Sequence, residues 1–292
     1  MIEKNRKENR SRTRVTGLLV AVGLLLFATV CPAWAHDHIN SGARSEAQGS
    51  ALYFPNGDRY STAQGWVCFL DKQDVTSGWS FTDGVTFGSL PGTVSTGGPV
   101  MGHAAFGAFL ELEFVDLKGP KGGTLAVWQR DEEFGTLTAL LELTTGGSPK
   151  GQRIPLTESD GSPAADPYGH IHGREFWVDK PGLYVLRVRL VDSSTHGLNQ
   201  GPIHSPSTIL PLYLQAENTL QVERNEAGGL RLTYAVRGHE TWAVEESPSV
   251  GVDAVWTEVH RAGGSTAGFL ASWEPEVGLT PCFYRLRQVT GF

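Results

Sequence analysis

Short strand-like runs recur along the chain, some with apolar and polar residues alternating with a period of two, and no stretch keeps a helical period over the length of a typical helix. The clearest alternation lies in Ala108–Asp116, where Leu110, Leu112 and Phe114 fall on one face and glutamates on the other. Short β-forming runs and glycine-rich turns are typical of a sandwich or a barrel. We therefore predict an all-β protein whose main domain is a β-sandwich of Ig- or cupredoxin-like type.

The predicted strands fall into two groups that meet near Ala216. The first group comprises Ala51–Phe54, Gly65–Leu70, Gly78–Thr82, Ala108–Asp116, Gly123–Gln129, Leu137–Leu143, Tyr168–Val178, Leu183–Val191 and Thr208–Gln215. The second group comprises Thr219–Arg224, Gly229–Val236, Thr241–Glu246, Ala254–Val259, Gly268–Trp273 and Cys282–Gln288. We expect a larger β-sandwich domain over residues 36–216 and a smaller one over residues 217–292.

Two strands of the first group are joined by Asp179-Lys180-Pro181-Gly182. Proline pre-sets φ and glycine accepts a positive φ, so this connection favours a tight turn. We expect Tyr168–Val178 and Leu183–Val191 to form an antiparallel hairpin. Because side chains alternate along a strand, His170 and His172 would then point the same way.

Residues 1–35 have the three parts of a secretory signal peptide. Six Lys and Arg residues precede an apolar run over residues 15–30, and Pro32-Ala33-Trp34-Ala35 supplies the small residues of a cleavage site. The run is shorter than the roughly 20 apolar residues of a spanning helix, and we expect no transmembrane segment in the mature chain. We expect cleavage after Ala35 and export to the periplasm, cell surface or medium, with lipidation at Cys31 as a minor alternative.

Charge and cysteine content narrow the classes of partner. Cleavage removes six of 24 Lys and Arg residues but only two of 31 Asp and Glu residues, which leaves a formal charge of −11. Such a surface argues against nucleic acid and anionic lipid as partners and suits attraction of cations. Only Cys68 and Cys282 remain, either as a disulfide that export permits or as two buried thiols.

The nine histidines are the most informative functional feature, and seven of them precede residue 205. Two imidazoles at i and i+2 on one strand grip a single ion, but zinc takes four ligands. We therefore predict a zinc or copper site formed by clustered histidines: His36, His38, His170, His172 and His204. We expect the mature chain to begin as an extended arm over residues 36–48. The alternative is that His170 and His172 are polar residues at a strand end and that His36 lies in a disordered, histidine-bearing arm. The other histidines we assign to the surface or to packing.

Cleavage after Ala35 would make His36 the first residue. Its amine, two backbone amides and the His38 imidazole then form the square plane that Cu(II) or Ni(II) prefers. Alternatively, the amine and ring of His36 form a copper brace with a second histidine.

Three parts of the first domain together resemble the bacterial surface-anchored proteins with "choice-of-anchor" domains. These parts are His170-Ile-His172 followed by Phe176-Trp177 and Lys180-Pro-Gly-Leu-Tyr184, Phe114-Val-Asp-Leu-Lys-Gly-Pro120 with Val127-Trp128, and His36-Asp-His-Ile-Asn-Ser-Gly42. The resemblance implies an exported β protein attached to the envelope by a C-terminal signal, and some such proteins are encoded beside metal-type transporters or under zinc-responsive control. Phe283-Tyr-Arg-Leu286 similarly resembles the end of short C-terminal β modules of secreted bacterial proteins. Since no hydrophobic tail or sorting motif is visible, we expect no C-terminal anchor.

Three functions remain in competition. The first is a non-enzymatic, exported metal-binding protein whose partners are a metal ion and envelope metal-transport components. The second is a structural or adhesive envelope module in which the histidines are incidental. The third is a copper oxidase with a histidine brace at His36. The sequence contains no nucleophile elbow, phosphate loop or zinc-protease motif, so it indicates no catalytic residue.

Overall fold

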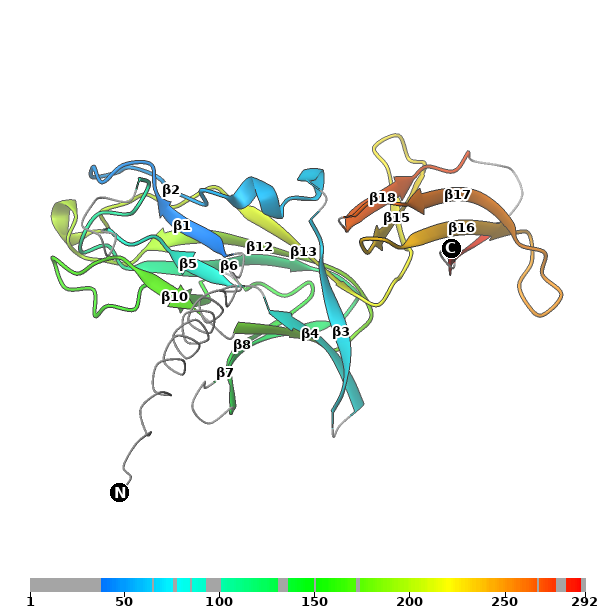
Figure 1. Ribbon diagram of the computed structural model, residues 1–292, viewed down its shortest axis with the longest axis horizontal. Helices are drawn as coiled ribbons and strands as arrows, with labels where there is room; N and C mark the ends of the chain where they lie inside the picture. The colour runs from blue at the N-terminus through cyan, green and yellow to red at the C-terminus, as the bar shows by residue number, and fades with distance from the viewer. Residues whose placement is uncertain are drawn as a thin grey trace, which may run out of the picture. The chain divides into compact units, whose positions relative to one another are not determined.

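The structure, a computed structural model, describes residues 38–64, 66–75, 78–84, 86–92, 101–130, 136–149, 151–171, 174–266, 268–276 and 282–289. Within these residues the chain is all-β, as predicted, apart from three short 3-10 helices (Figure 1). These helices are η1 (Gly57–Tyr60), η2 (Thr62–Gln64) and η3 (Leu198–Gln200). The buried apolar side chains form two clusters, one within residues 39–216 and the other within residues 220–286.

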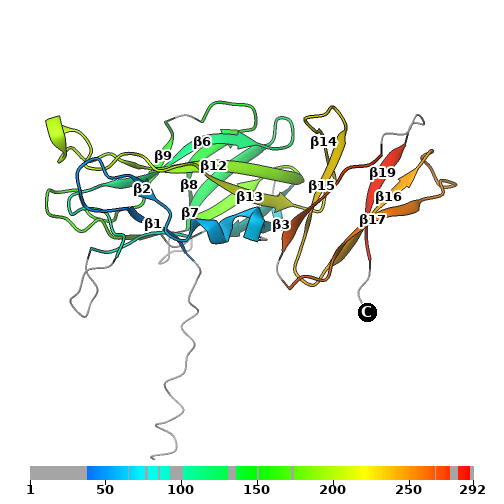
Figure 2. The same ribbon diagram turned by 90° about the horizontal axis from the view of Figure 1, so that it is seen from above.

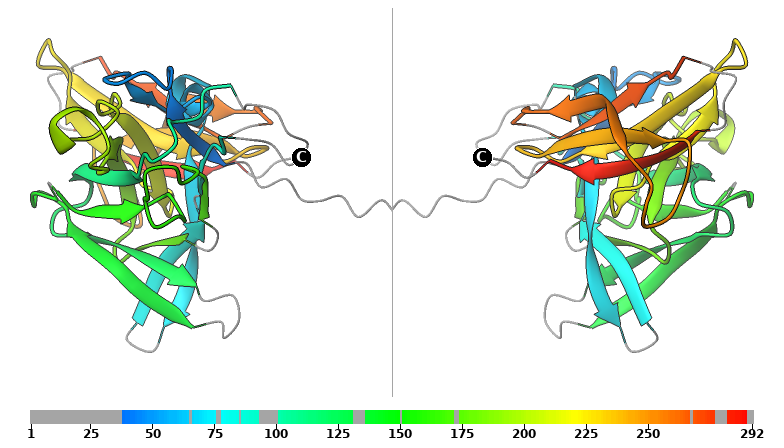
Figure 3. Two further views of the ribbon diagram at one scale, coloured as in Figure 1. Left: turned by 90° about the vertical axis from the view of Figure 1, so that its left-hand side faces the viewer. Right: turned by 90° about the vertical axis from the view of Figure 1, so that its right-hand side faces the viewer.

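The largest sheet has nine strands. In sheet order they are β8 (Leu137–Thr144), β7 (Thr124–Arg130), β11 (Arg174–Val178), β4 (Gly78–Gly84), β3 (Cys68–Val75), β13 (Leu210–Ala216), β12 (Gly182–Asp192), β6 (Leu110–Lys118) and β9 (Arg153–Pro155). Neighbours pair antiparallel except β3 and β13, which run parallel. Figures 1 and 3 show that two hairpins of this sheet, β3–β4 (cyan) and β7–β8 (green), extend together to one side of the domain.

Alternating burial explains why β12 and its neighbour β6 form strands. Every second residue of β12 is fully buried: Tyr184, Leu186, Val188 and Leu190. On β6 the predicted inward face is confirmed, because Leu110, Leu112 and Phe114 are likewise fully buried. Each such side chain stabilises the fold by about 1.5–3 kcal/mol relative to an exposed one.

β11 and β12 do not form the predicted hairpin. β11 pairs with β4 and β7, and β12 pairs with β6 and β13, so three strands lie between them in the sheet. The turn before Gly182 instead carries the chain from one part of the sheet to another, and Gly182 has a φ of 139° that glycine adopts readily. Local alternation predicts a strand but not its partner.

A second sheet, of four strands, lies in the same domain. Its order is β10 (Gly169–Ile171), β5 (Phe87–Ser89), β1 (Ile39–Ala43) and β2 (Leu52–Tyr53). The prediction of an extended arm over residues 36–48 is wrong for β1, whose residues Ile39 and Ala43 are fully buried. The sequence of β1, Ile-Asn-Ser-Gly-Ala, is largely polar or small, and its partner Phe87 lies far along the chain, so no local pattern revealed it.

The remaining strands form a smaller module with two three-stranded sheets, which Figure 2 shows as separate layers. One sheet has the order β14 (Gln221–Arg224), β15 (Leu230–Val236) and β18 (Phe269–Trp273), and the other β17 (Thr257–Gly263), β16 (Thr241–Ser247) and β19 (Phe283–Gln288). Between them Leu232, Tyr234 and Val244 are fully buried. His260, which the sequence analysis assigned to the surface or to packing, packs here, stacked on Trp273 at 5.8 Å between ring centroids.

Candidate metal site

The four-stranded sheet brings the amino end of the domain and the His170 strand to neighbouring positions (Figure 1). β5 lies between β1 and β10, so the register joins Asn40 to Gly88 and Gly88 to His170. Because neighbouring strands lie about 4.8 Å apart, the backbones of residues 40 and 170 are separated by roughly 10 Å. Segments far apart in the sequence are therefore close in the fold.

The same register shows at which end of the four-stranded sheet His38 lies. The Ile39 N–H donates to the Thr86 carbonyl at 2.9 Å, which continues the β1–β5 ladder to the end of the sheet where β1 begins and β10 ends. His38 precedes Ile39 and is half-buried. At the same end of the sheet, Ile171 is the last residue of β10.

His204 lies in a different setting, a buried cluster of loop residues around His103, Asp192 and His204 that we call the hub. It is only 2 % exposed, and its Nε2 accepts the Ala105 N–H at 2.9 Å. Nε2 therefore carries the lone pair, and the proton on Nδ1 is donated to the Ser50 carbonyl at 3.2 Å. Both ring nitrogens are used by the backbone, so an ion at His204 would first have to displace one of these partners.

Asp192 organises this hub. Its Oδ1 accepts the N–H groups of Phe109 (3.1 Å) and Ser194 (2.9 Å), and its Oδ2 those of Ile203 (2.8 Å) and His204 (3.0 Å). Burial lowers the pKa of His204 below its usual value, because the charged imidazolium would be poorly solvated there, and this outweighs the attraction of Asp192. His204 is therefore neutral at pH 7 in the folded protein.

The sequence did not single out His103 or Asp192, and both contribute to the hub. His103 is 5 % exposed, and its Nε2 lies 3.4 Å from a carboxylate oxygen of Glu46. His196 also binds the backbone, with Nδ1 2.8 Å from the Gly107 carbonyl. The only sequence signal for the hub is an aspartate at the end of the longest apolar strand, followed by Ser-Ser-Thr.

The structure thus separates the predicted site residues. His38 and the backbone of His170 occur at one end of the four-stranded sheet, whereas His204 occurs in the hub. His36, His172 and the side chain of His170 lie outside the described residues. Among the residues that the structure does describe, no three His, Cys, Asp or Glu side chains form a group that could hold a metal ion.

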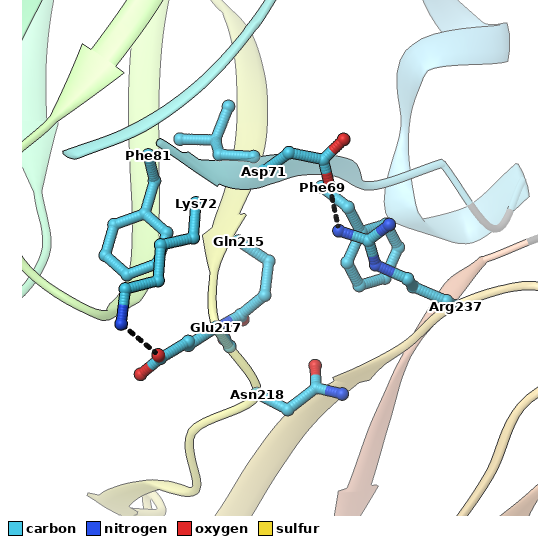
Figure 4. A pocket seen from close by; sticks show the side chains of 9 residues that line it. Phe69, Asp71, Lys72, Phe81, Gln215, Glu217, Asn218 and Arg237 are labelled. Atoms are coloured by element: carbon cyan, nitrogen blue, oxygen red, sulfur yellow. Dashed lines mark hydrogen bonds and ion pairs between the residues drawn. The ribbon is translucent and has the colours of Figure 1, made fainter. Parts of the chain in front are cut away.

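A hollow in the surface lies beside β3 and β13, where Figure 4 shows two ion pairs. Asp71 pairs with Arg237 at 2.8 Å, and Lys72 with Glu217 at 3.8 Å. All four side chains are about half exposed, so each pair contributes little to stability. The opposite charges offset each other, and the hollow offers neither a histidine nor an acidic cluster to a cation.

Comparison with protein-family models and with curated proteins gives no match to this chain. Function therefore has to be argued from the residues and their geometry. Two further observations bear on the sequence predictions. Cys68 and Cys282 both carry reduced thiols, the first buried and the second exposed. None of the helices within the described residues has the length and apolar character needed to cross a bilayer.

Proposed function

We propose that this protein is an exported, non-enzymatic metal-binding protein of the bacterial envelope, with a zinc or copper site at the end of the four-stranded sheet where β1 begins. The observation that carries the proposal is the register Asn40–Gly88–His170 across β1, β5 and β10. It supports the convergence of two histidine groups that are more than a hundred residues apart in the chain. His38 with His170 and His172 supply three imidazoles, and His36 supplies a fourth nitrogen donor.

The spacing of the sheet suits this role. His38 and His172 directly adjoin the paired residues Ile39 and Ile171, which are both partners of Phe87. In the proposed site, histidines from the two sides of this one intervening strand share the ion. Imidazole nitrogens are preferred ligands of both Zn(II) and Cu(II), and zinc binds them at about 2.0–2.1 Å. The excess of acidic residues favours approach of the cation.

His204 is left out of the proposed site because both its ring nitrogens already have backbone partners. Export and envelope attachment rest on residues 1–35 and on the resemblance to surface-anchored proteins. Envelope metal-transport components are the corresponding partners.

Isothermal titration of the mature chain with Zn(II) and Cu(II) tests the proposal. We expect a dissociation constant below about 10 µM, and loss of that binding in the double variant His170→Ala/His172→Ala. His239→Ala is the matched control, because His239 is exposed in a turn of the small module. Binding weaker than about 10 µM in the unmodified chain, or equal binding in the double variant, would refute a site of this composition.

Mass spectrometry of the mature amino terminus belongs to the same experiment. A terminus at His36 provides the amine that the copper chelate and the copper-oxidase brace require. Any residue ahead of His36 removes that amine, and then only imidazoles are available to the ion.

A second candidate, an adhesive or structural envelope module, is favoured by the β16–β17 connection. Val250, Val252 and Val255 are 64 %, 101 % and 76 % exposed there, and exposed apolar side chains gathered in one segment are typical of contact surfaces. Replacing the three valines by serine and measuring co-sedimentation with purified envelope fragments tests this role. If the valines mediate attachment, co-sedimentation falls while metal affinity is unchanged.

A further inference from the structure

β8 forms one edge of the nine-stranded sheet, and it is the longest edge strand within the described residues. It pairs with β7 on one side, and in this part of the chain no backbone hydrogen bond joins its other side to a further strand. Five of its eight side chains are exposed, and Glu142 is its only charged residue. Such an edge offers a row of backbone N–H and C=O groups to another strand.

The other sheet edges are protected in ways that β8 is not. β2, β9 and β10 have only two or three residues, and β14, β17 and β19 carry charged side chains. β18 has no charged residue, but only one of its five side chains is exposed. Short strands and charged side chains prevent one sheet edge from pairing with another. Among the described strands, β8 is therefore the edge on which an added strand meets least resistance.

Two residues of β8 turn their backbone groups toward its open side. Just beyond β8, the Thr145 N–H donates to the Gly123 carbonyl at 2.8 Å, and in an antiparallel ladder every second pair after this one is hydrogen-bonded. Glu142 belongs to a pair between these. Leu140 has no partner on β7, and this extra residue shifts the alternation so that Ala139 also belongs to a pair without hydrogen bonds. The N–H and C=O groups of Glu142 and Ala139 therefore point away from β7.

Apolar side chains lie next to this edge on the outer face of the sheet. Because Val127 is fully buried, its neighbour Trp128 lies on the opposite, outer face, where its ring centroid is 6.0 Å from that of Trp177. Ala139 is in register with Trp128, and the adjacent Leu140 is 37 % exposed. A strand added to β8 would cover these side chains as well as the backbone groups, so apolar burial favours the pairing.

We propose that β8 pairs antiparallel with β8 of a second copy of this chain, around a two-fold axis between Leu140 and Leu141. The outward backbone groups of Glu142 and Ala139 are equally far from this axis. Each Glu142 therefore lies opposite Ala139 of the other copy, where donors meet acceptors. This symmetry favours a second copy over an unrelated strand as the partner. The pairing does not depend on a metal site.

Charge does not oppose this register. The two Glu142 side chains lie three positions apart along the new pair, because each is opposite Ala139. Three residues of strand span about 10 Å, which exceeds the screening length of about 8 Å at physiological salt. Like charges therefore do not face each other across the axis, although the chain as a whole is acidic.

Sedimentation velocity of the mature chain over a series of concentrations tests the proposal. We expect the average mass to rise from that of one chain toward that of two in the micromolar range, since one pair of strands makes a small interface. Glu142→Pro removes an N–H that points away from β7, so it blocks the new pair and keeps the old one. Leu140→Lys places two like charges beside the axis without altering the backbone. Val222→Lys is the matched control, because Val222 is 59 % exposed on another edge strand, β14.

We expect both β8 variants to associate at least about tenfold more weakly than the unmodified chain, and the control to associate equally well. Melting temperatures measured on the same samples show whether each variant folds, and Leu140→Lys decides if Glu142→Pro does not. A chain that stays monomeric at every concentration overturns the proposal, and this is the result expected if the edge serves an extended segment of another protein. A dimer that persists in the folded β8 variants overturns it as well, because such a dimer forms through another surface.

Discussion

Replacement of Asp192 is expected to destabilise the larger domain strongly. The carboxylate accepts four backbone N–H groups from three loop segments and is only 7 % exposed. In Asp192→Ala all four donors lose a charged acceptor, and solvent reaches the hub only if the loops move apart. Hydrogen bonds to charged groups contribute about 1.5–3 kcal/mol each, but four that share one carboxylate are not additive. We therefore expect a loss of about 3–5 kcal/mol, as for other buried charged networks.

Urea unfolding followed by tryptophan fluorescence measures this loss. Asp192→Asn is the sharper variant, because the amide keeps one acceptor oxygen but turns an NH₂ group toward two N–H donors. Asp253→Asn is its control, since Asp253 lies exposed in a loop of the small module. A loss below about 1 kcal/mol for Asp192→Ala would refute the view that this carboxylate holds the loops together.

Three further predictions concern acidity, backbone contact and thiols. The pKa of His204 is lowered in the folded state by burial, so the folded protein binds fewer protons than the unfolded chain. The free energy of unfolding should therefore fall as the pH drops below about 6.5, and go on falling until the folded pKa is reached. Urea unfolding at several pH values should show that His204→Gln flattens this dependence. Gly42→Ala should cost about 1–3 kcal/mol by the same measurement, because its Cβ would lie 2.0 Å from the Gly102 carbonyl oxygen. In the mature chain a thiol reagent should titrate Cys282 alone before unfolding and Cys68 as well afterwards, whereas no reaction in denaturant would indicate a disulfide.

Strand content could be predicted from the sequence wherever one face of a strand is buried. β6 and β12 show this clearly, because alternate side chains lie in the core and their apolar period of two is visible in the sequence. β1 could not be found in this way. Only its backbone and a few small or apolar side chains are buried, and its partner β5 is a three-residue strand far along the chain.

Strand partners and polar contacts were less predictable for a physical reason. The Pro181-Gly182 turn indicates a change of direction, but a hairpin and a crossing between parts of one sheet use similar turn residues. Pro55-Asn56-Gly57 likewise indicated only a turn, and nothing local shows that the Asn56 side chain binds β1. Hydrogen bonds between distant segments depend on tertiary contacts that a single sequence does not display.

His38 and His204, the two predicted site residues whose side chains the structure describes, lie near opposite ends of β1. His38 precedes the strand, whereas His204 binds the Ser50 carbonyl beside Ala51, whose own carbonyl accepts the Arg44 N–H directly after β1 ends. Five residues of extended strand span about 16 Å, and an ion holds its nitrogen ligands at about 2.0–2.1 Å, so one ion does not reach both ends.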